Sequence, residues 1–440
     1  MNRIQRIQLA IQSSFTEFFQ RTTSTGIIIL AMTAIALIWT NSPAYESYGL
    51  MLHQAIKIAI GNLKLEFTLE HVVNDGLMVL FFLVVGLEIK RELLVGELST
   101  RQKALLPMIA AVFGMVGPAL VYLFYNAGTP AAGGWGVPVA TDIAFALGVL
   151  ALLGDKIPSG LRVFLAALAI VDDLLAVLVI ALFYTASLNV TMLVAAVGIT
   201  AALYAGNRLR INSLWFYGIL GFALWIVVLS SGIHATIAGV VLAMCIPAES
   251  RIDRVSFFTK ARTVLDAIAQ RTETDEEEGA QMDAVHALER MCEHVQTPLH
   301  RIEHGLSGIV SFVIMPIFAL FNAGVRIESS MISTVTSPLS LGVILGLFIG
   351  KQAGITLSVW LSYKLGITRL PEHVTMQQMY GVSLLCGIGF TMALFVAQLA
   401  FQSSPDQLST AKLSVLIGSS LSAIVGAAVL SLMLPQRAQG

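Results

Sequence analysis

The sequence has 440 residues, of which 56% are hydrophobic and 12% are charged. Soluble proteins carry about 25% charged residues, so this composition excludes a string of soluble domains and indicates a polytopic membrane protein. The formal net charge of −1 gives no sign of a nucleic-acid partner, and the three cysteines lack the spacing of a metal site or a disulfide framework.

Twelve apolar segments are long enough to span a bilayer. They lie at 22–41, 70–90, 104–125, 137–154, 159–184, 189–206, 214–230, 232–247, 306–325, 338–362, 376–401 and 411–434. The sequence therefore predicts an all-α protein with twelve transmembrane helices. Basic residues precede the first segment, but no small-residue cleavage site follows it, so we interpret this segment as a retained helix rather than a signal peptide.

The distribution of lysine and arginine predicts the orientation of the helices. With twelve spans, both ends of the chain lie on one side of the membrane. That side holds 21 of the 26 Lys and Arg residues, the other side holds four, and Lys351 lies inside a predicted helix. Cytoplasmic loops carry the excess of positive charge. We therefore predict that both termini are cytoplasmic.

A hairpin signal lies at 56–67, on the predicted outer side. Two alternating runs flank Gly61-Asn62, and a glycine-first pair between such runs favours a β-hairpin. A lone hairpin is marginally stable in water. It either pairs with a second subunit, which would make the protein a homodimer, or it lies on its own membrane face.

The loop at 248–305 divides the chain. Helices 1–8 and the hairpin occupy 1–247, and helices 9–12 occupy 306–440. Apolar residues at helical spacing flank the acidic run 275–278 within the loop. We predict a cytoplasmic helical hairpin with an acidic turn, which is either a regulatory module or a solvated insert.

Four charged residues lie deep inside predicted helices: Asp142, Asp172, Asp173 and Lys351. Each costs roughly 2.5–3.5 kcal/mol at a helix centre, which makes an unneeded charge rare. Adjacent helix residues point about 100° apart, so one aspartate can face Lys351 while its neighbour faces an ion cavity. A carboxylate that binds either Na⁺ or a proton exchanges the two by competition. The structural alternative is a static salt-bridge cluster that fixes helix packing.

Two predicted helices contain a break. Pro138 and preceding glycines weaken the fourth segment just before Thr141 and Asp142, which are both good N-cap residues. Glycines weaken the eleventh segment at 385–394. Each break precedes one further helix in a run of three. Interrupted segments at matching positions are typical of transporters with inverted repeats.

These stretches resemble the bacterial sodium/proton antiporter family NhaA over nearly the whole chain. The motifs that carry the resemblance are 73–92, 140–146, 171–173, 231–236, 322–325, 350–351 and 386–391. The resemblance implies two interrupted helices that cross, a cytoplasmic funnel and a homodimer joined partly by the outer β-hairpin. It also implies a bacterial inner-membrane protein that is not an enzyme and exchanges cytoplasmic Na⁺ or Li⁺ for external protons electrogenically. Na⁺, Li⁺ and H⁺ would be transported ions, and no cofactor is expected.

Residue roles follow from the same motifs. Asp173 would be the main Na⁺ or Li⁺ ligand, and Asp172 would bind ions and exchange with Lys351. Asp142 would compensate helix dipoles at the crossing, which Thr141 would also line.

Four more residues match positions linked to pH response: Glu88, His234, Glu303 and His304. The structural alternatives are a hydrogen-bonded helix-end histidine at 234 and ordinary loop charges at 303 and 304.

The sequence departs from the family pattern in three places. Leu175 replaces an expected glycine, Gln352 replaces a proline, and the 248–305 loop is unusually long. The alternative function is a sodium-coupled symporter for a small organic solute. That function would need a roomy polar pocket, and few other deep polar residues are present. The Gly-x-Gly-Asp context of an intramembrane aspartyl protease is absent.

Overall fold

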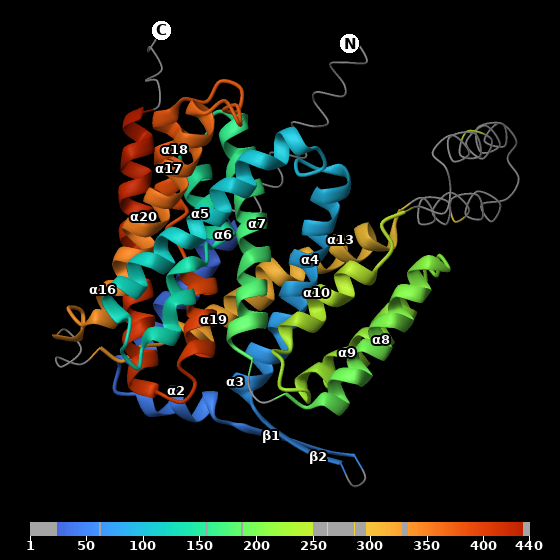
Figure 1. Cartoon of the computed structure of the whole chain (residues 1–440). Helices are drawn as coiled ribbons and strands as arrows, with labels where there is room; N and C mark the ends of the chain where they lie inside the picture. The colour runs from blue at the N-terminus through green and yellow to red at the C-terminus, as the bar shows by residue number, and fades with distance from the viewer. Residues whose placement is uncertain are drawn as a thin grey trace, which may run out of the picture.

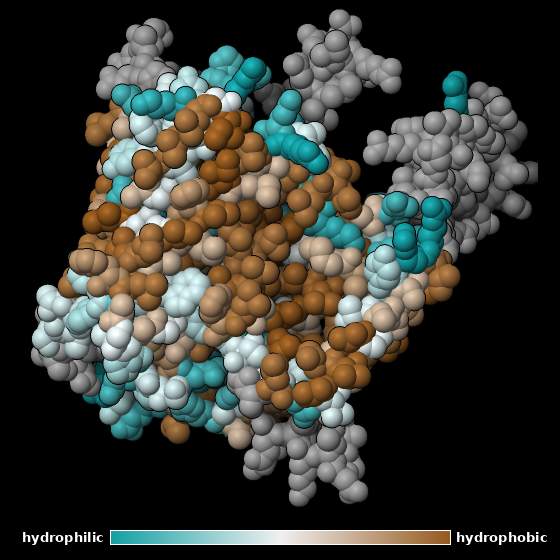
Figure 2. All heavy atoms as spheres, viewed as in Figure 1, coloured by the Kyte–Doolittle hydropathy of each residue, from teal (hydrophilic) through white to brown (hydrophobic). Residues whose placement is uncertain are grey.

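A computed structural model of the chain describes residues 24–60, 63–154, 157–185, 188–249, 262, 286, 296–327 and 333–433. These residues form a bundle of helices, with one β-hairpin at one end (Figure 1). The surface in Figure 2 is hydrophobic over a broad middle zone, and hydrophilic residues gather toward the two ends. This pattern fits a bundle whose middle faces lipid.

Eight helices in the described ranges are long and apolar enough to cross a membrane. They are α3–η1–α4 (Leu69–His71, Val72–Leu77, Met78–Val95), α5 (Arg101–Asn126), η2–α6 (Ala132–Val139, Ile143–Leu152), α7 (Ser159–Phe183), α8 (Val190–Arg208), α13–η4–α14 (Pro298–Ile309, Val310–Ile314, Met315–Asn322), α16–η5–α17 (Pro338–Leu345, Gly346–Gly350, Lys351–Lys364) and α20 (Pro405–Met433). The mostly helical membrane fold is confirmed.

Two bent pairs raise the number of spans to ten if each pair is counted as one. They are Ser24–Thr40 with α2 (Tyr45–Leu52), bent by 116°, and α18 (Met376–Leu385) with α19 (Phe390–Ala400), bent by 48°. Two further apolar helices are shorter: α9 (Leu214–Leu229) has 16 residues and α10 (Thr236–Cys245) has 10. Each predicted segment falls on one of these helices or pairs.

The predicted hairpin is confirmed. Strands β1 (Ala55–Ile60) and β2 (Leu63–Thr68) pair antiparallel, with Ala55 opposite Thr68 and Ile60 opposite Leu63. They form the sole sheet in the described part of the chain. The two turn residues, 61 and 62, lie outside that part. The hairpin projects from the end of the bundle near α2 (Figure 1).

Local capping explains where several helices begin. The Thr297 hydroxyl accepts a hydrogen bond from the His300 amide, and Pro298 stands at the first helical position. Helix α13 therefore begins eight residues before the predicted ninth span. The helical hairpin and acidic turn predicted in the 248–305 loop lie outside the described residues, which include positions 248–249, 262, 286 and 296–305 of that loop.

Close helix packing brings Lys351 into the interior. A methyl group on Gly354 would lie 2.1 Å from the Phe113 carbonyl oxygen, and one on Gly350 would lie 2.5 Å from the Pro118 Cα. Only glycine fits at these two positions, so α5 and the start of α17 approach backbone to backbone. Lys351 lies between the two glycines and is 0% exposed.

Candidate functional site

The two predicted breaks contact each other in the middle of the bundle. The first separates η2 from α6 at 140–142, and the second separates α18 from α19 at 386–389. The Thr141 hydroxyl donates to the Cys386 carbonyl oxygen at 2.9 Å, and the Asp142 amide donates to the Ile388 carbonyl oxygen at 2.7 Å. Backbone groups left unpaired by one break are thus satisfied by the other.

The Asp142 carboxylate accepts hydrogen bonds from the N-termini of two helices. Its Oδ1 accepts from the Phe145 amide at 3.1 Å, and this bond caps α6. Its Oδ2 accepts from the Thr391 amide at 3.1 Å and also from the Thr391 hydroxyl. Thr391 is in the first turn of α19. The Asp142 carboxylate, which is 1% exposed, therefore offsets the positive ends of two helices.

Asp172 and Lys351 form a buried ion pair. The Lys351 Nζ lies 2.9 Å and 2.8 Å from the two Asp172 carboxylate oxygens and also donates to the Val139 carbonyl oxygen. Val139 is the last residue of η2, so the ammonium satisfies a carbonyl at a helix C-terminus. The side chains are 0% and 1% exposed. The π-helix η5 ends directly before Lys351, and such segments are frequent at functional sites.

Asp173 has a different environment from its neighbour. It is 2% exposed, and its Oδ1 is buried without a hydrogen-bond partner among the described residues. It lines a cavity of about 620 Å³, together with Asp142 and Thr391. Adjacent positions on α7 thus give one paired aspartate and one unpaired aspartate beside open space.

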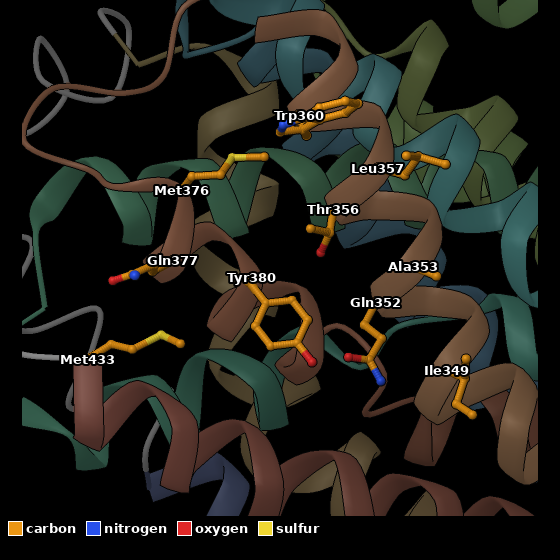
Figure 3. Close-up of a pocket in the computed structure, with 10 residues that line it drawn as sticks. All are labelled: Ile349, Gln352, Ala353, Thr356, Leu357, Trp360, Met376, Gln377, Tyr380 and Met433. Carbon is orange, nitrogen blue, oxygen red and sulfur yellow. The ribbon is translucent and has the colours of Figure 1, made fainter. Parts of the chain in front are cut away.

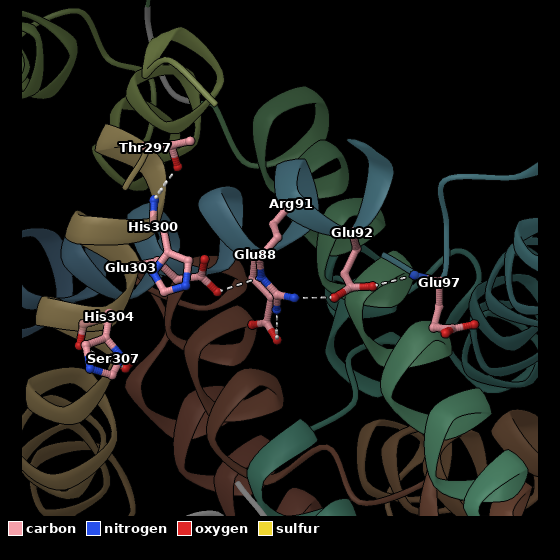
Figure 4. Close-up of polar contacts among 9 residues, drawn as sticks. All are labelled: Glu88, Arg91, Glu92, Glu97, Thr297, His300, Glu303, His304 and Ser307. Carbon is pink, nitrogen blue, oxygen red and sulfur yellow. Dashed lines mark hydrogen bonds and ion pairs between the residues drawn. The ribbon is translucent and has the colours of Figure 1, made fainter. Parts of the chain in front are cut away.

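The same cavity extends to a charged cluster on α4 and α13. Glu88, Arg91, His300, Glu303 and His304 all line it. The Arg91 Nε donates to Glu303 at 3.0 Å, and the Arg91 guanidinium lies 2.8 Å from Glu92 and 4.0 Å from Glu88 (Figure 4). Arg91 therefore links two acidic residues of its own helix to one on α13.

Not all predicted residues share this cavity. Thr141, Asp172 and Lys351 are not among its lining residues. His234 lies between α9 and α10, where it interacts with Asp75 and the backbone of Tyr184. The structure brings together three of the four predicted pH-response residues and leaves His234 elsewhere.

Sequence reasoning missed three partners in these contacts. Thr391 belongs to the 386–391 motif without a predicted role, although a threonine two positions after Gly389 is close enough to the break to mark a helix start. Arg91 lies in the 73–92 motif without a predicted role, and its position three residues after Glu88 is the available signal. The Val139 carbonyl belongs to the backbone, so no residue type could reveal it.

Within the described ranges, no group of three or more His, Cys, Asp or Glu residues is placed to hold a metal ion. The carboxylates available from the cavity near the crossing are Asp173 and Asp142. The Asp142 oxygens already accept the hydrogen bonds of α6 and α19, so Asp173 is the carboxylate there with an oxygen free for a cation.

Comparisons with known proteins identify the family of this chain. The sequence model of the family described as Na+/H+ antiporter 1 matches residues 16–430. The Na(+)/H(+) antiporter NhaA of Oleidesulfovibrio alaskensis is 46% identical over 426 residues, which cover 96% of this chain and 94% of that protein. The proteins of that name from Koribacter versatilis and Rhizobium etli are 46% and 44% identical, and the matches cover 95% and 96% of this chain and 91% and 96% of theirs.

A solved structure shares the fold. The sodium proton antiporter MjNhaP1 from Methanocaldococcus jannaschii superposes with a TM-score of 0.51 at 13% identity, covering 93% of this chain and 92% of that one. All of these relatives are named antiporters, so the symporter alternative gains no support. The extent of the family match and the identity to these relatives show that this chain belongs to the Na+/H+ antiporter 1 family, whose members are transporters and not enzymes.

Proposed function

We propose that the Na⁺/H⁺ antiport of this family takes place in this chain at the Asp173 carboxylate. The observation that carries the proposal is the unpartnered Asp173 Oδ1 beside the 620 Å³ cavity. A buried carboxylate without a partner is relieved either by a proton or by a cation. Na⁺ or Li⁺ and H⁺ therefore compete for one group, and their alternation across the membrane is exchange.

Asp142 and Thr141 hold the crossing in this proposal. The Asp142 oxygens accept bonds from both α6 and α19, and Thr141 donates to the other break. The Asp142 charge would still raise the affinity of the cavity for cations, because Asp142 also lines it.

The Asp172–Lys351 pair would supply the second proton. A cation that binds beside Asp173 would also attract the adjacent Asp172. This attraction would weaken the ion pair between Asp172 and Lys351. A buried ammonium that loses its carboxylate releases its proton. One proton from Asp173 and one from Lys351 would then be exchanged for each monovalent cation, so transport would be electrogenic.

The charged cluster around Arg91 would regulate exchange by pH. His304 lines the cavity beside Glu303 and Glu88. Protonation there would alter the potential along the path of the ion. His234 would act separately, through its interaction with Asp75.

The membrane arrangement extends the same proposal. The ten spans and the two shorter helices α9 and α10 would make twelve transmembrane helices. Two broken spans, η2–α6 and α18–α19, are each followed by an unbroken helix, α7 or α20, which fits an inverted repeat. Both termini and the mouth of the cavity would face the cytoplasm of a bacterium, across its inner membrane. The hairpin would pair with a second subunit outside.

Everted membrane vesicles test the assignment. Na⁺ or Li⁺ added to vesicles with an imposed pH gradient should discharge the gradient, and Asp173→Asn should abolish the response. Asp406→Asn is the matched control, because Asp406 is exposed at the start of α20. Exchange retained by Asp173→Asn would refute the site, and no Na⁺ response by the parent between neutral and alkaline pH would refute the function.

A further inference from the structure

A second cavity lies on the outside of the bundle, away from the ion site. It is an apolar groove of about 630 Å³ over α18, between α17 and the end of α20 (Figure 3). Its lining residues are Ile349, Gln352, Ala353, Thr356, Leu357, Trp360, Met376, Gln377, Tyr380 and Met433. Its volume lies within the range of about 300–1,000 Å³ typical of ligand sites. Carbon atoms supply nearly all of its exposed wall.

The length of the groove matches one leaflet of a bilayer. Its lining extends along η5 and α17 from Ile349 to Trp360, which are eleven positions apart. At about 1.5 Å per residue, this distance is about 17 Å. The hydrocarbon core of a bilayer is about 30 Å thick, so one leaflet supplies about 15 Å. An extended acyl chain of one leaflet therefore fits along the groove.

Polar groups in the groove lack protein partners. The side chains of Gln352, Gln377 and Tyr380 have no hydrogen-bond partner in the part of the chain that the structure describes. Thr356, by contrast, shares a hydrogen bond of 2.7 Å with Ser383. The polar atoms of Gln352, Gln377 and Tyr380 contribute almost none of the exposed wall, so the wall itself suits an apolar chain.

The end of the groove at Trp360 carries positive charge. The Lys364 Nζ lies 4.8 Å from the centroid of the Trp360 ring. Lys364 is exposed, and Arg369 is exposed in the connection that follows α17. Neither has a carboxylate partner among the residues that can be described. Trp and Lys are typical of the membrane interface, and unpaired cations there attract anionic head groups.

We propose that this groove binds one acyl chain of an anionic phospholipid, with the phosphate beside Lys364. This binding site goes beyond the antiport function, and only its assignment to the cytoplasmic leaflet depends on the orientation proposed above. Gln352 follows Lys351 directly on α17, so a lipid in the groove contacts the helix that carries the buried ammonium. Lipid occupancy should therefore stabilise α17 in its present position.

Native mass spectrometry of the full chain tests the site. The protein is purified in detergent and titrated with phosphatidylglycerol or phosphatidylcholine. We expect one tightly retained phosphatidylglycerol in the parent. Ala353→Trp should fill the groove and reduce binding of that lipid at least tenfold. Ala428→Trp is the matched control, since Ala428 is exposed on α20 and outside the groove. It should keep the lipid.

Lys364→Gln tests the head group without disturbing the packed interior. It should reduce the preference for phosphatidylglycerol over phosphatidylcholine about fivefold, which corresponds to about 1 kcal/mol for one interfacial lysine. The proposal is wrong if Ala353→Trp keeps the lipid, or if both tryptophan variants lose it equally. It is also wrong if Ala353→Trp changes only the oligomeric state, because the groove would then be a subunit interface. Equal binding of the two lipids by the parent would refute the head-group assignment.

Discussion

Replacing Lys351 by glutamine removes the cation from the buried pair with Asp172. The ammonium donates to both carboxylate oxygens and to the Val139 carbonyl. Glutamine is shorter by one bond and offers only two donor hydrogens to these three acceptors. The Asp172 carboxylate, 1% exposed, would be left without a compensating charge.

The expected loss follows from the burial of the pair. Breaking a buried ion pair by removing one partner costs about 3–5 kcal/mol, because the other charge is left uncompensated. Asp172→Asn alone leaves Lys351 unpaired and should cost a similar amount. Asp172→Asn combined with Lys351→Gln removes both charges, and two amides can still share a hydrogen bond. We expect the double variant to be at least 2 kcal/mol more stable than the sum of the two single losses predicts.

The assay is a double-mutant cycle on purified protein. Unfolding in detergent is followed by circular dichroism, for the parent, both single variants and the double variant. Additive losses within about 0.5 kcal/mol would show that the two side chains do not depend on each other. That result would refute the pair as a stabilising contact.

Transport by the double variant shows whether the Asp172–Lys351 pair takes part in exchange or only stabilises the fold. Asp173 is intact in this variant, so exchange should continue. It should carry one proton per cation and leave the membrane potential unchanged, because Lys351 no longer carries a second proton. A potential-sensitive dye in proteoliposomes reports the difference. A potential generated at the parental level would show that the second proton comes from another group.

Three further outcomes are expected. Thr391→Val should weaken apparent Na⁺ affinity and lower the free energy of unfolding by about 1–2 kcal/mol, since the hydroxyl donates to Asp142. Thr410→Val is the control, because the Thr410 hydroxyl donates to the Asp406 carbonyl of its own helix, away from the cavity, and equal effects would refute the role. Arg91→Gln should raise the pH at which exchange is half-maximal, because loss of the guanidinium lets the charged cluster on α4 and α13 bind protons more tightly. Arg91→Lys should shift it less, and a shift to lower pH would contradict the proposal. Deletion of 56–67 should weaken dimerisation, which size-exclusion chromatography measures, and an unchanged oligomer would exclude the hairpin contact.

Local patterns predicted the elements of the site well. Thr141 and Asp142 follow Pro138 and are strong N-cap types, so the start of α6 could be inferred from neighbouring residues alone. The glycines at 387 and 389 marked the second break in the same way. The alternation on both sides of Gly61-Asn62 predicted the hairpin, because strand periodicity and turn chemistry are local properties.

Contacts between distant segments were harder to predict from the sequence. Thr391 and Asp142 are 249 positions apart, and Lys351 and Val139 are 212 apart. No sequence period relates such pairs. The backbone carbonyl of Val139 attracts the ammonium only because η2 ends there, and this end depends on how the two breaks pack. The residues that line the cavity likewise come from six packed spans, so the sequence could not separate His234 from Glu303 and His304.

The two aspartates on α7 differ because their charges are balanced by different means. Asp172 is paired with Lys351, and Asp173 lines the cavity in which we propose that a mobile cation binds. Since the residues are adjacent, we expect a cation at Asp173 to attract Asp172 and to compete with Lys351 for its charge. At 4 Å and an effective dielectric of 20, two unit charges interact by about 4 kcal/mol. That is comparable with the 3–5 kcal/mol that holds a buried pair. We therefore expect sodium at one carboxylate to loosen the lysine at the other.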